Sequence, residues 1–129
     1  MSLYNRITEL KRSMTMTEPT KLTVLWTTDN PVTAMDMVLL YSHNAFKHGW
    51  WEEVTVSIWG ASVHLVKENE VIQEELKAMI AAGIKVEACI VCANRNNATE
   101  VLQELGVKVY GWGDPLTRAL KGDSALLSV

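Results

Sequence analysis

The chain of 129 residues carries 12 lysines and arginines against 15 aspartates and glutamates, so its formal net charge is −3. That length is typical of one domain with a full hydrophobic core, and 48% hydrophobic residues is far above the content of a disordered chain. Without clustered Lys and Arg, the chain lacks the electrostatic footprint of a nucleic-acid-binding protein. Its apolar runs are much shorter than the ~20 residues of a membrane span, so we expect contact with neither nucleic acid nor membrane.

Residues 1–20 differ from the rest of the chain in their polar, largely unpatterned composition. We expect a loosely ordered N-terminal extension with a short helix over Leu3–Leu10, followed by a single domain over residues 21–129. Basic side chains are scattered through the first twenty residues, and no apolar stretch of the kind found in signal peptides is seen among them. This composition predicts a cytoplasmic protein.

From Lys21 onward, short apolar segments alternate with amphipathic segments. Short β-branched segments predict strands, and apolar residues spaced i, i+3, i+4 predict helices. The expected strands cover residues 22–28, 53–59, 84–91, 107–110 and 125–129. The expected helices begin near Asn30, Asn69, Asn97 and Asp114 and end near Gly49, Gly83, Gly106 and Gly122. Residues 63–66 fit either a helical turn or a buried loop.

The first helix has the clearest pattern. Asn30 is a good N-cap residue, and Pro31 suits the first helical position because its missing N–H costs nothing there. The predicted buried face of this helix consists of Ala34, Met37, Val38, Tyr41 and Ala45. Four strand–helix units and a closing strand predict a three-layer α/β fold, in which helices cover both faces of a mostly parallel five-stranded sheet.

The phosphate-binding fingerprints of α/β proteins are missing. The first expected strand leads into Thr28, Asp29 and Asn30, with neither a G-x-G-x-x-G nor a G-x-x-x-x-G-K-[ST] motif. No G-x-S-x-G elbow of an α/β-hydrolase is found either. We therefore expect no nucleotide and no other cofactor.

The strongest local signal is a C-x-x-C pair, Cys89 and Cys92, at the carboxyl end of the third expected strand. Open α/β sheets bind their ligands at that edge. In a straight strand the two thiols would face opposite sides, about 10 Å apart. A disulfide needs Cα atoms within about 7 Å, so it would require a turn at residues 90–91. We expect Cys89 at the strand end and Cys92 in the following turn, where Arg95 can stabilise a thiolate.

The same cysteines also fit a second interpretation, as small hydrophobic residues of the core, and the sequence leaves both open. A thioredoxin site is less favoured, because there the motif opens a helix after the first strand. Zinc is less favoured still, because a closed site needs two further ligands while His43, His48 and His64 are scattered singly, so no metal is expected.

Other polar residues are expected to share this edge of the sheet. A helix beginning near Ser62 would offer an anion site there, and His64 fits either the crevice or a partly buried structural role. Trp50, Trp51, Trp59 and Trp112 suggest a buried subunit contact. The candidate crevice consists of Thr28, Asp29, Asn30, Gly60, Ala61, Ser62 and His64.

The element order, the turn at Asp29–Pro31 and the stretch from Cys89 to Arg95 resemble the DsrE/DsrF family, especially its YchN-like branch. The resemblance covers residues 21–129. It implies a compact α/β domain that assembles as a homotrimer or homohexamer and acts in sulfur metabolism. By position, Cys89 matches the family cysteine that receives sulfane sulfur as a persulfide, and Cys92 matches the second cysteine of the YchN-like branch. Arg95 matches an arginine usually followed by glycine, whereas Asn96 follows it here.

The resemblance therefore implies a sulfur carrier or sulfurtransferase subunit, with Cys89 as acceptor, Cys92 as resolving thiol and Arg95 stabilising charge. Sulfur-donor and sulfur-acceptor proteins would be its partners. Persulfide transfer needs an accessible thiolate but neither metal nor nucleotide, which agrees with the missing motifs. The alternative is a non-enzymatic oligomeric protein that binds a small ligand or regulates a partner, with structural cysteines. A third interpretation is a structural subunit whose partner performs the chemistry.

Overall fold

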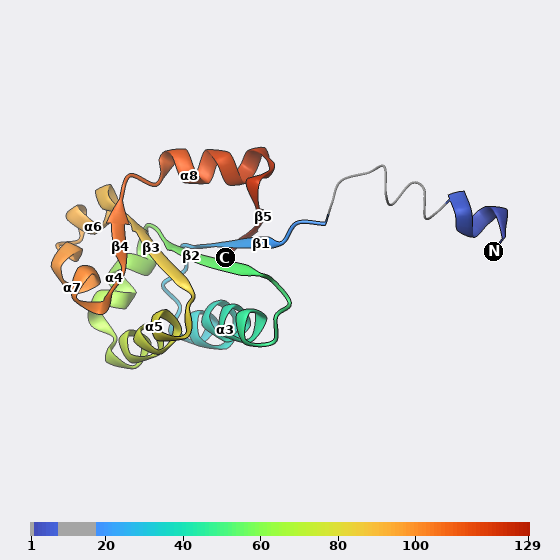
Figure 1. Cartoon of the computed structure of the whole chain (residues 1–129). Coiled ribbons are helices and arrows are strands. Elements are labelled where there is room, and N and C mark those ends of the chain that lie inside the picture. Colours follow the sequence, from blue (N-terminus) through green and yellow to red (C-terminus); the bar gives the residue numbers. More distant parts are fainter. Residues whose placement is uncertain (1, 8–17) are drawn as a thin grey trace.

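The computed structural model describes residues 2–7 and 18–129 (Figure 1). Residues 3–7 are helical, and the remainder of the helix expected up to Leu10 lies outside the described residues, together with most of the polar stretch that follows it. Within the described ranges, every helix is too short or too polar to cross a bilayer. Strands and helices alternate from Lys21 to the end of the chain.

The centre of the molecule is a five-stranded sheet with the order β4-β3-β2-β1-β5 (Figure 1). All four strand pairings are parallel, which confirms the predicted α/β class and makes the sheet wholly rather than mostly parallel. The strands are β1 (Lys21–Trp26), β2 (Glu53–Ile58), β3 (Lys85–Cys89), β4 (Lys108–Tyr110) and β5 (Ala125–Ser128).

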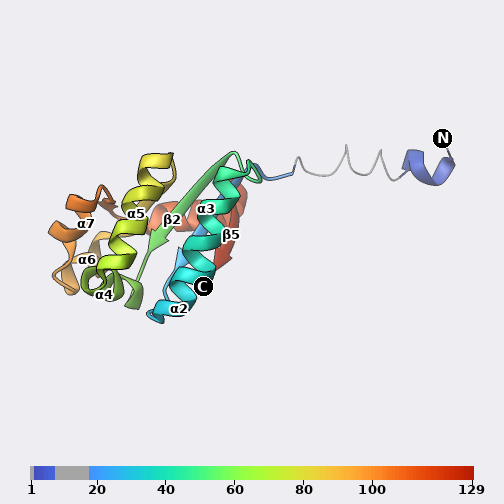
Figure 2. The same cartoon turned by 90° about the horizontal axis from the view of Figure 1, so that it is seen from below.

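The helices cover both faces of this sheet and so form the predicted three layers. Helices α3 and α5 pack on one face, and α8 lies on the opposite face (Figures 1 and 2). Helices α6 and α7 contact the β3–β4 end of the sheet. The helical segments are α2 (Pro31–Thr33), the π-helix η1 (Ala34–Leu39), α3 (Leu40–Lys47), α4 (Ala61–Glu68), α5 (Glu70–Ala82), α6 (Ile90–Arg95), α7 (Thr99–Leu105), α8 (Gly113–Arg118) and the π-helix η2 (Ala119–Asp123).

Several helix ends lie where the sequence predicts them. The Asn30 side chain accepts a hydrogen bond from the Thr33 N–H at 2.9 Å, and the Asn69 side chain caps α5 in the same way. Gly83 ends α5 in the left-handed region, with φ of 111°. Helix α7 begins at Thr99, two residues after the start expected at Asn97, and it has no side-chain cap.

The predicted buried face of the first helix is partly wrong, and η1 supplies the reason. A π-helical turn holds more residues than an α-helical turn, so it rotates the positions that follow it. Ala34, Val38 and Ala45 are buried as expected, but Met37 is exposed. Leu39 and Ser42 are buried near the positions predicted for Met37 and Tyr41.

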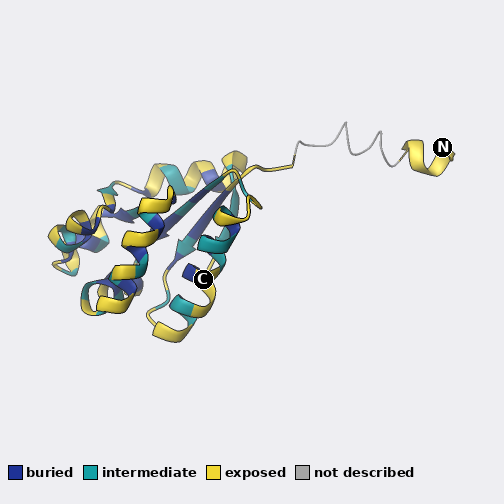
Figure 3. Ribbon diagram, turned by 60° about the horizontal axis from the view of Figure 1, so that its bottom comes forward, coloured by how far each residue is buried: buried dark blue, intermediate teal, exposed yellow. Residues whose placement is uncertain are grey.

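The core lies between the sheet and the helical segments η1, α3, α4, α5 and α7 (Figure 3). Residues 63–66, which fitted either a helix or a loop, belong to α4 and contribute Val63 and Val66 to this core. Trp112 is buried within the chain, and Trp50 is the one exposed member of the tryptophans expected at a subunit contact. The largest fully buried side chains are those of Trp26, Leu39, Ile58, Ile72, Leu76, Met79 and Leu102.

Candidate functional site

The two cysteines flank the junction between β3 and α6. The third strand ends at Cys89 rather than at Val91, and Cys89 is also the N-cap residue of α6. Cys92 lies in the first turn of that helix. The chain therefore turns at Ile90 and Val91, which is the condition that brings the two thiols to one side. Cys89 is only 7% exposed, whereas Cys92 is half-buried.

The two thiols interact with each other, and both are free cysteines. Burial raises the pKa of the Cys92 thiol, and the hydrogen bond to Cys89 and the charge of Cys89 raise it further. The backbone of Gly60 and the charge of Arg95 oppose this rise. The contact with Cys89 therefore favours the protonated form of the Cys92 thiol.

Arg95 lies in the last turn of α6, three residues after Cys92, and is exposed. The helix ends at Asn96, whose side-chain N–H donates to the Cys92 carbonyl oxygen at 2.8 Å. The left-handed conformation of this turn falls on Asn97, with φ of 50°, and not on Asn96. Asparagine tolerates that region better than most residues. The turn after Arg95 thus forms without a glycine at position 96.

The second strand reaches this site through Gly60, which comes directly before α4 with φ of 62°. Its neighbour Ser62 is fully buried. The Ser62 hydroxyl donates to the Trp26 carbonyl oxygen at 2.6 Å and accepts from the Trp59 N–H at 3.1 Å. These hydrogen bonds join the ends of β1 and β2. Ser62 therefore bonds to the backbone of the protein, whereas the sequence predicted it as a ligand contact.

The remaining crevice residues divide between structural and exposed positions. The Thr28 hydroxyl accepts a hydrogen bond from the Asn30 N–H at 3.2 Å, and Asn30 in turn caps α2. Asp29 and Ala61 are exposed. His64 lies on α4 and is exposed, so the expected partial burial of His64 is wrong.

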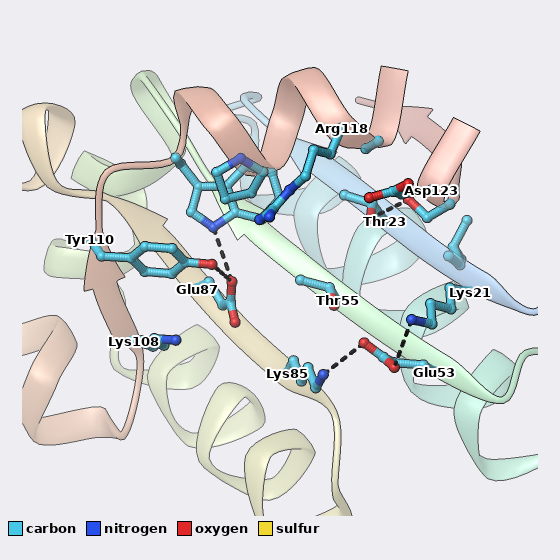
Figure 4. Close-up of a pocket in the computed structure, with 15 residues that line it drawn as sticks. Lys21, Thr23, Glu53, Thr55, Lys85, Glu87, Lys108, Tyr110, Arg118 and Asp123 are labelled. Carbon is cyan, nitrogen blue, oxygen red and sulfur yellow. Dashed lines mark hydrogen bonds and ion pairs between the residues drawn. The ribbon is translucent and has the colours of Figure 1, made fainter. Parts of the chain in front are cut away.

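A second polar feature, which sequence reasoning missed, lies on the sheet face beneath α8 (Figure 4). It is a groove with a cavity volume of about 530 Å³. The sequence does indicate this polar face. Polar residues recur at every second position of β2 and β3, which is typical of strands with one polar face. The Glu87 carboxylate stands on its floor and accepts hydrogen bonds from the Tyr110 hydroxyl and the Trp112 indole.

Comparison with known proteins agrees with this architecture. The model of the DsrE/DsrF-like family matches residues 21–127. Among solved structures, a conserved protein of unknown function from Bacteroides thetaiotaomicron is 39% identical in sequence, with a TM-score of 0.82; the match covers 85% of this chain and 95% of that one. A comparison with curated proteins gives no match. The match to the solved structure confirms the three-layer fold and extends over nearly the whole domain.

Proposed function

We propose that this chain accepts sulfane sulfur on Cys89 as a persulfide and passes it on. The chain belongs to the DsrE/DsrF-like family and so has a sulfur-relay-related fold. The observation that carries the proposal is the contact between the Cys89 and Cys92 thiols at the carboxyl end of β3. A thiolate is the nucleophile in sulfur transfer. The raised pKa of Cys92 disfavours its own thiolate, so we assign the attack to Cys89.

The transfer step follows from thiolate chemistry. The Cys89 thiolate attacks the outer sulfur of a donor persulfide, and a new S–S bond forms on Cys89. The S–S bond of the donor breaks, and its electron pair leaves with the donor thiolate. An acceptor thiolate then attacks the outer sulfur on Cys89 in the same manner, so the protein carries the sulfur without net oxidation or reduction.

Cys92 gives the carrier a second outcome. Its thiolate can attack the inner sulfur of the Cys89 persulfide, which forms the Cys89–Cys92 disulfide and releases hydrosulfide. The raised pKa of Cys92 opposes this reaction at neutral pH, because little of the attacking thiolate is present. We therefore propose that the persulfide survives long enough to be transferred and that Cys92 resolves it slowly.

Intact mass measurement tests the proposal directly. The reduced full chain, Cys89→Ser and Cys92→Ser are each incubated with thiosulfate or with a small-molecule persulfide, and the gain of one sulfur atom is recorded. We expect a gain in the parent chain that is lost in Cys89→Ser and retained in Cys92→Ser. Equal labelling of Cys89→Ser and the parent chain would overturn the assignment of Cys89.

The near-complete burial of Cys89 favours one rival, a protein that binds a small ligand or regulates a partner and has inert structural cysteines. The same experiment separates the two. No sulfur gained by any of the three chains, together with slow alkylation of both thiols in the folded state, would establish the cysteines as core residues. Fast alkylation of Cys89 would remove this rival, because a packed thiol reacts slowly.

We further propose that the chain works as a cytoplasmic homotrimer or homohexamer with sulfur-donor and sulfur-acceptor proteins as partners. Large exposed apolar side chains support an assembly: Leu40 on α3 is 54% exposed, Val71 on α5 is 67% exposed, and Trp50 in the turn after α3 is 60% exposed. Aromatic residues are enriched in protein interfaces. Light scattering at micromolar concentration should give the mass of three or six chains, and Leu40→Lys should reduce it. A monomeric mass for the parent chain would contradict the assembly.

A further inference from the structure

The groove beneath α8 has the construction of a ligand site that is separate from the cysteines (Figure 4). Ligand pockets of proteins have volumes of roughly 300–1,000 Å³, and this groove falls within that range at about 530 Å³. Its floor is the polar face of the sheet, because alternate residues of each strand point the same way. The strand residues on that floor are Lys21, Thr23, Glu53, Thr55, Lys85, Glu87, Lys108 and Tyr110.

The most constrained group in the groove is the Glu87 carboxylate. The Tyr110 hydroxyl and the Trp112 indole N–H both donate to Oε1 of this carboxylate, the second at 3.1 Å. Burial and the neighbouring carboxylate raise the pKa of Tyr110 to about 12, so the phenol keeps its proton and remains a donor. Oε2 accepts no hydrogen bond from any described residue. One oxygen thus fixes the carboxylate, and the other is available to a ligand.

Two positively charged side chains of the groove, Lys108 and Arg118, are not fully neutralised by carboxylates of the described residues. Lys108 is the pairing partner of Glu87 across β3 and β4, and its ammonium lies 4.5 Å from the centre of the Tyr110 ring. It forms no ion pair within the described part of the chain. Arg118 reaches over the groove from α8 (Figure 4), and among the described residues its one ion pair is with the exposed Asp114 of the same helix, at 3.3 Å. Such an exposed pair contributes little.

Two side-chain hydroxyl groups of β2 form no hydrogen bond with any described residue. Thr55 lines the floor, and its side chain forms no hydrogen bond with the described residues. Ser57 is fully buried and pairs in register with Glu87, so both side chains lie on the same face of the sheet. Its Oγ has no hydrogen-bond partner among the described residues. Ser57 does not line the groove, so Thr55 is the hydroxyl of this strand that a bound ligand could reach.

The signs of the charges define the class of ligand. Glu53 accepts ion pairs from Lys85 at 2.7 Å and Lys21 at 4.0 Å, so these two cations are partly neutralised. Lys108 and Arg118 remain for an anionic group, and Oε2 of Glu87 remains for a cationic donor. We propose that the groove binds a zwitterionic small molecule of the amino-acid class, its ammonium group on Glu87 and its carboxylate between Lys108 and Arg118. This site involves neither cysteine and does not depend on sulfur transfer.

Titration calorimetry on the full chain tests this site. The common L-amino acids are titrated one at a time at millimolar concentration. Each binder is then compared with the amine that lacks its carboxylate and the acid that lacks its amine. We expect at least one amino acid to bind and each truncated analogue to bind at least about tenfold more weakly, since charge-assisted hydrogen bonds are the stronger ones.

Variants locate the binding. Glu87→Gln keeps an oxygen for Tyr110 and Trp112 but removes the charge, so it should weaken binding about tenfold or more. The matched control is Glu74→Gln, on the exposed surface of α5, which should leave the affinity unchanged. Cys89→Ser should also bind normally, which separates this site from the proposed sulfur carrier.

Four results would each overturn the proposal. The first is no binding of any amino acid to the folded parent chain. The second is equal affinity of the parent chain and Glu87→Gln, and the third is equal binding of an acid that lacks its amine. If chemical cross-linking shows that a second copy of the chain covers Glu87 and excludes ligands, the groove is a subunit contact, and the proposal fails as well.

Discussion

Replacing Ser62 by alanine should destabilise the fold, because this hydroxyl joins the ends of two central strands. It donates to the Trp26 carbonyl oxygen at 2.6 Å and accepts from the Trp59 N–H at 3.1 Å, in a fully buried position. Each such bond contributes about 1 kcal/mol. Alanine has a higher helix propensity than serine, which offsets about 0.5 kcal/mol of the lost unfolding free energy. The expected loss is therefore about 1–2 kcal/mol of unfolding free energy.

The loss stays at this level because the backbone groups are not orphaned. The Trp59 N–H also donates to the Trp26 carbonyl oxygen at 3.0 Å, and that bond remains when the hydroxyl is removed. A bond left entirely unmade in the core would cost more. The variant should consequently fold, and a clear two-state urea transition is expected for it.

Urea unfolding followed by circular dichroism measures the effect. The midpoint should fall in Ser62→Ala while the slope of free energy against urea stays unchanged, since the exposed area is the same. Ser128→Ala is the matched control, because Ser128 is exposed near the end of β5, and it should change stability by less than about 0.5 kcal/mol. Equal stability of Ser62→Ala and the control would refute the structural role and return Ser62 to the list of ligand contacts.

Three further predictions concern single groups. Burial raises the pKa of Tyr110 to about 12 from 10, so the folded chain keeps a proton that the unfolded chain loses, and stability should fall between pH 10 and 12. Urea midpoints should record a loss of about 1 kcal/mol after solvent screening, and Tyr110→Phe should not show it. Cys89→Ala should lower the pKa of Cys92, because Cys89 raises it, and the alkylation profile of Cys92 should shift to lower pH; an unchanged profile would contradict the contact between the two thiols. Gly83→Ala should cost about 1–3 kcal/mol, because φ is 111° and the new Cβ would lie 3.1 Å from the Phe46 ring; thermal unfolding within a degree of the parent chain would contradict that strain.

The general fold could be predicted from the sequence because local and global signals agree in it. Val24, Val56 and Val86 stand in short β-branched segments and form the buried face of the sheet. Asn30 and Asn69 are found at the helix starts that their side chains favour. When propensity, capping and hydrophobic period all point to one element, its position follows from the sequence.

The details of the site did not follow, because there local preference and tertiary structure disagree. Ile90 and Val91 are β-branched and read as a continuation of the third strand, yet they form the first turn of α6. Packing overrides such weak propensities. The helix they begin has only six residues, too few for a periodic pattern. The contact between Gly60 and Cys92 joins residues 32 positions apart, which spacing alone does not indicate.

The groove was missed for a different reason. The prediction of β2 rests on its apolar residues Val54, Val56 and Ile58 and makes no use of the polar residues between them. A strand in which apolar and polar residues alternate has one polar face, but a single sequence does not say which distant helix lies over that face. The pairing of the Tyr110 hydroxyl with Glu87 depends on the parallel register of β3 and β4, which only the fold supplies.

The strand order also has a consequence for folding during synthesis on the ribosome. Strand β1 is almost the first part of the domain to be made, yet one of its edges pairs with β5, the last strand of the chain. Strand β5 is made after the other four strands, so this edge of β1 stays unpaired until β5 has been synthesised. An open, apolar edge strand is a template for aggregation. Pairing with β5 therefore closes an edge that the incomplete chain leaves exposed.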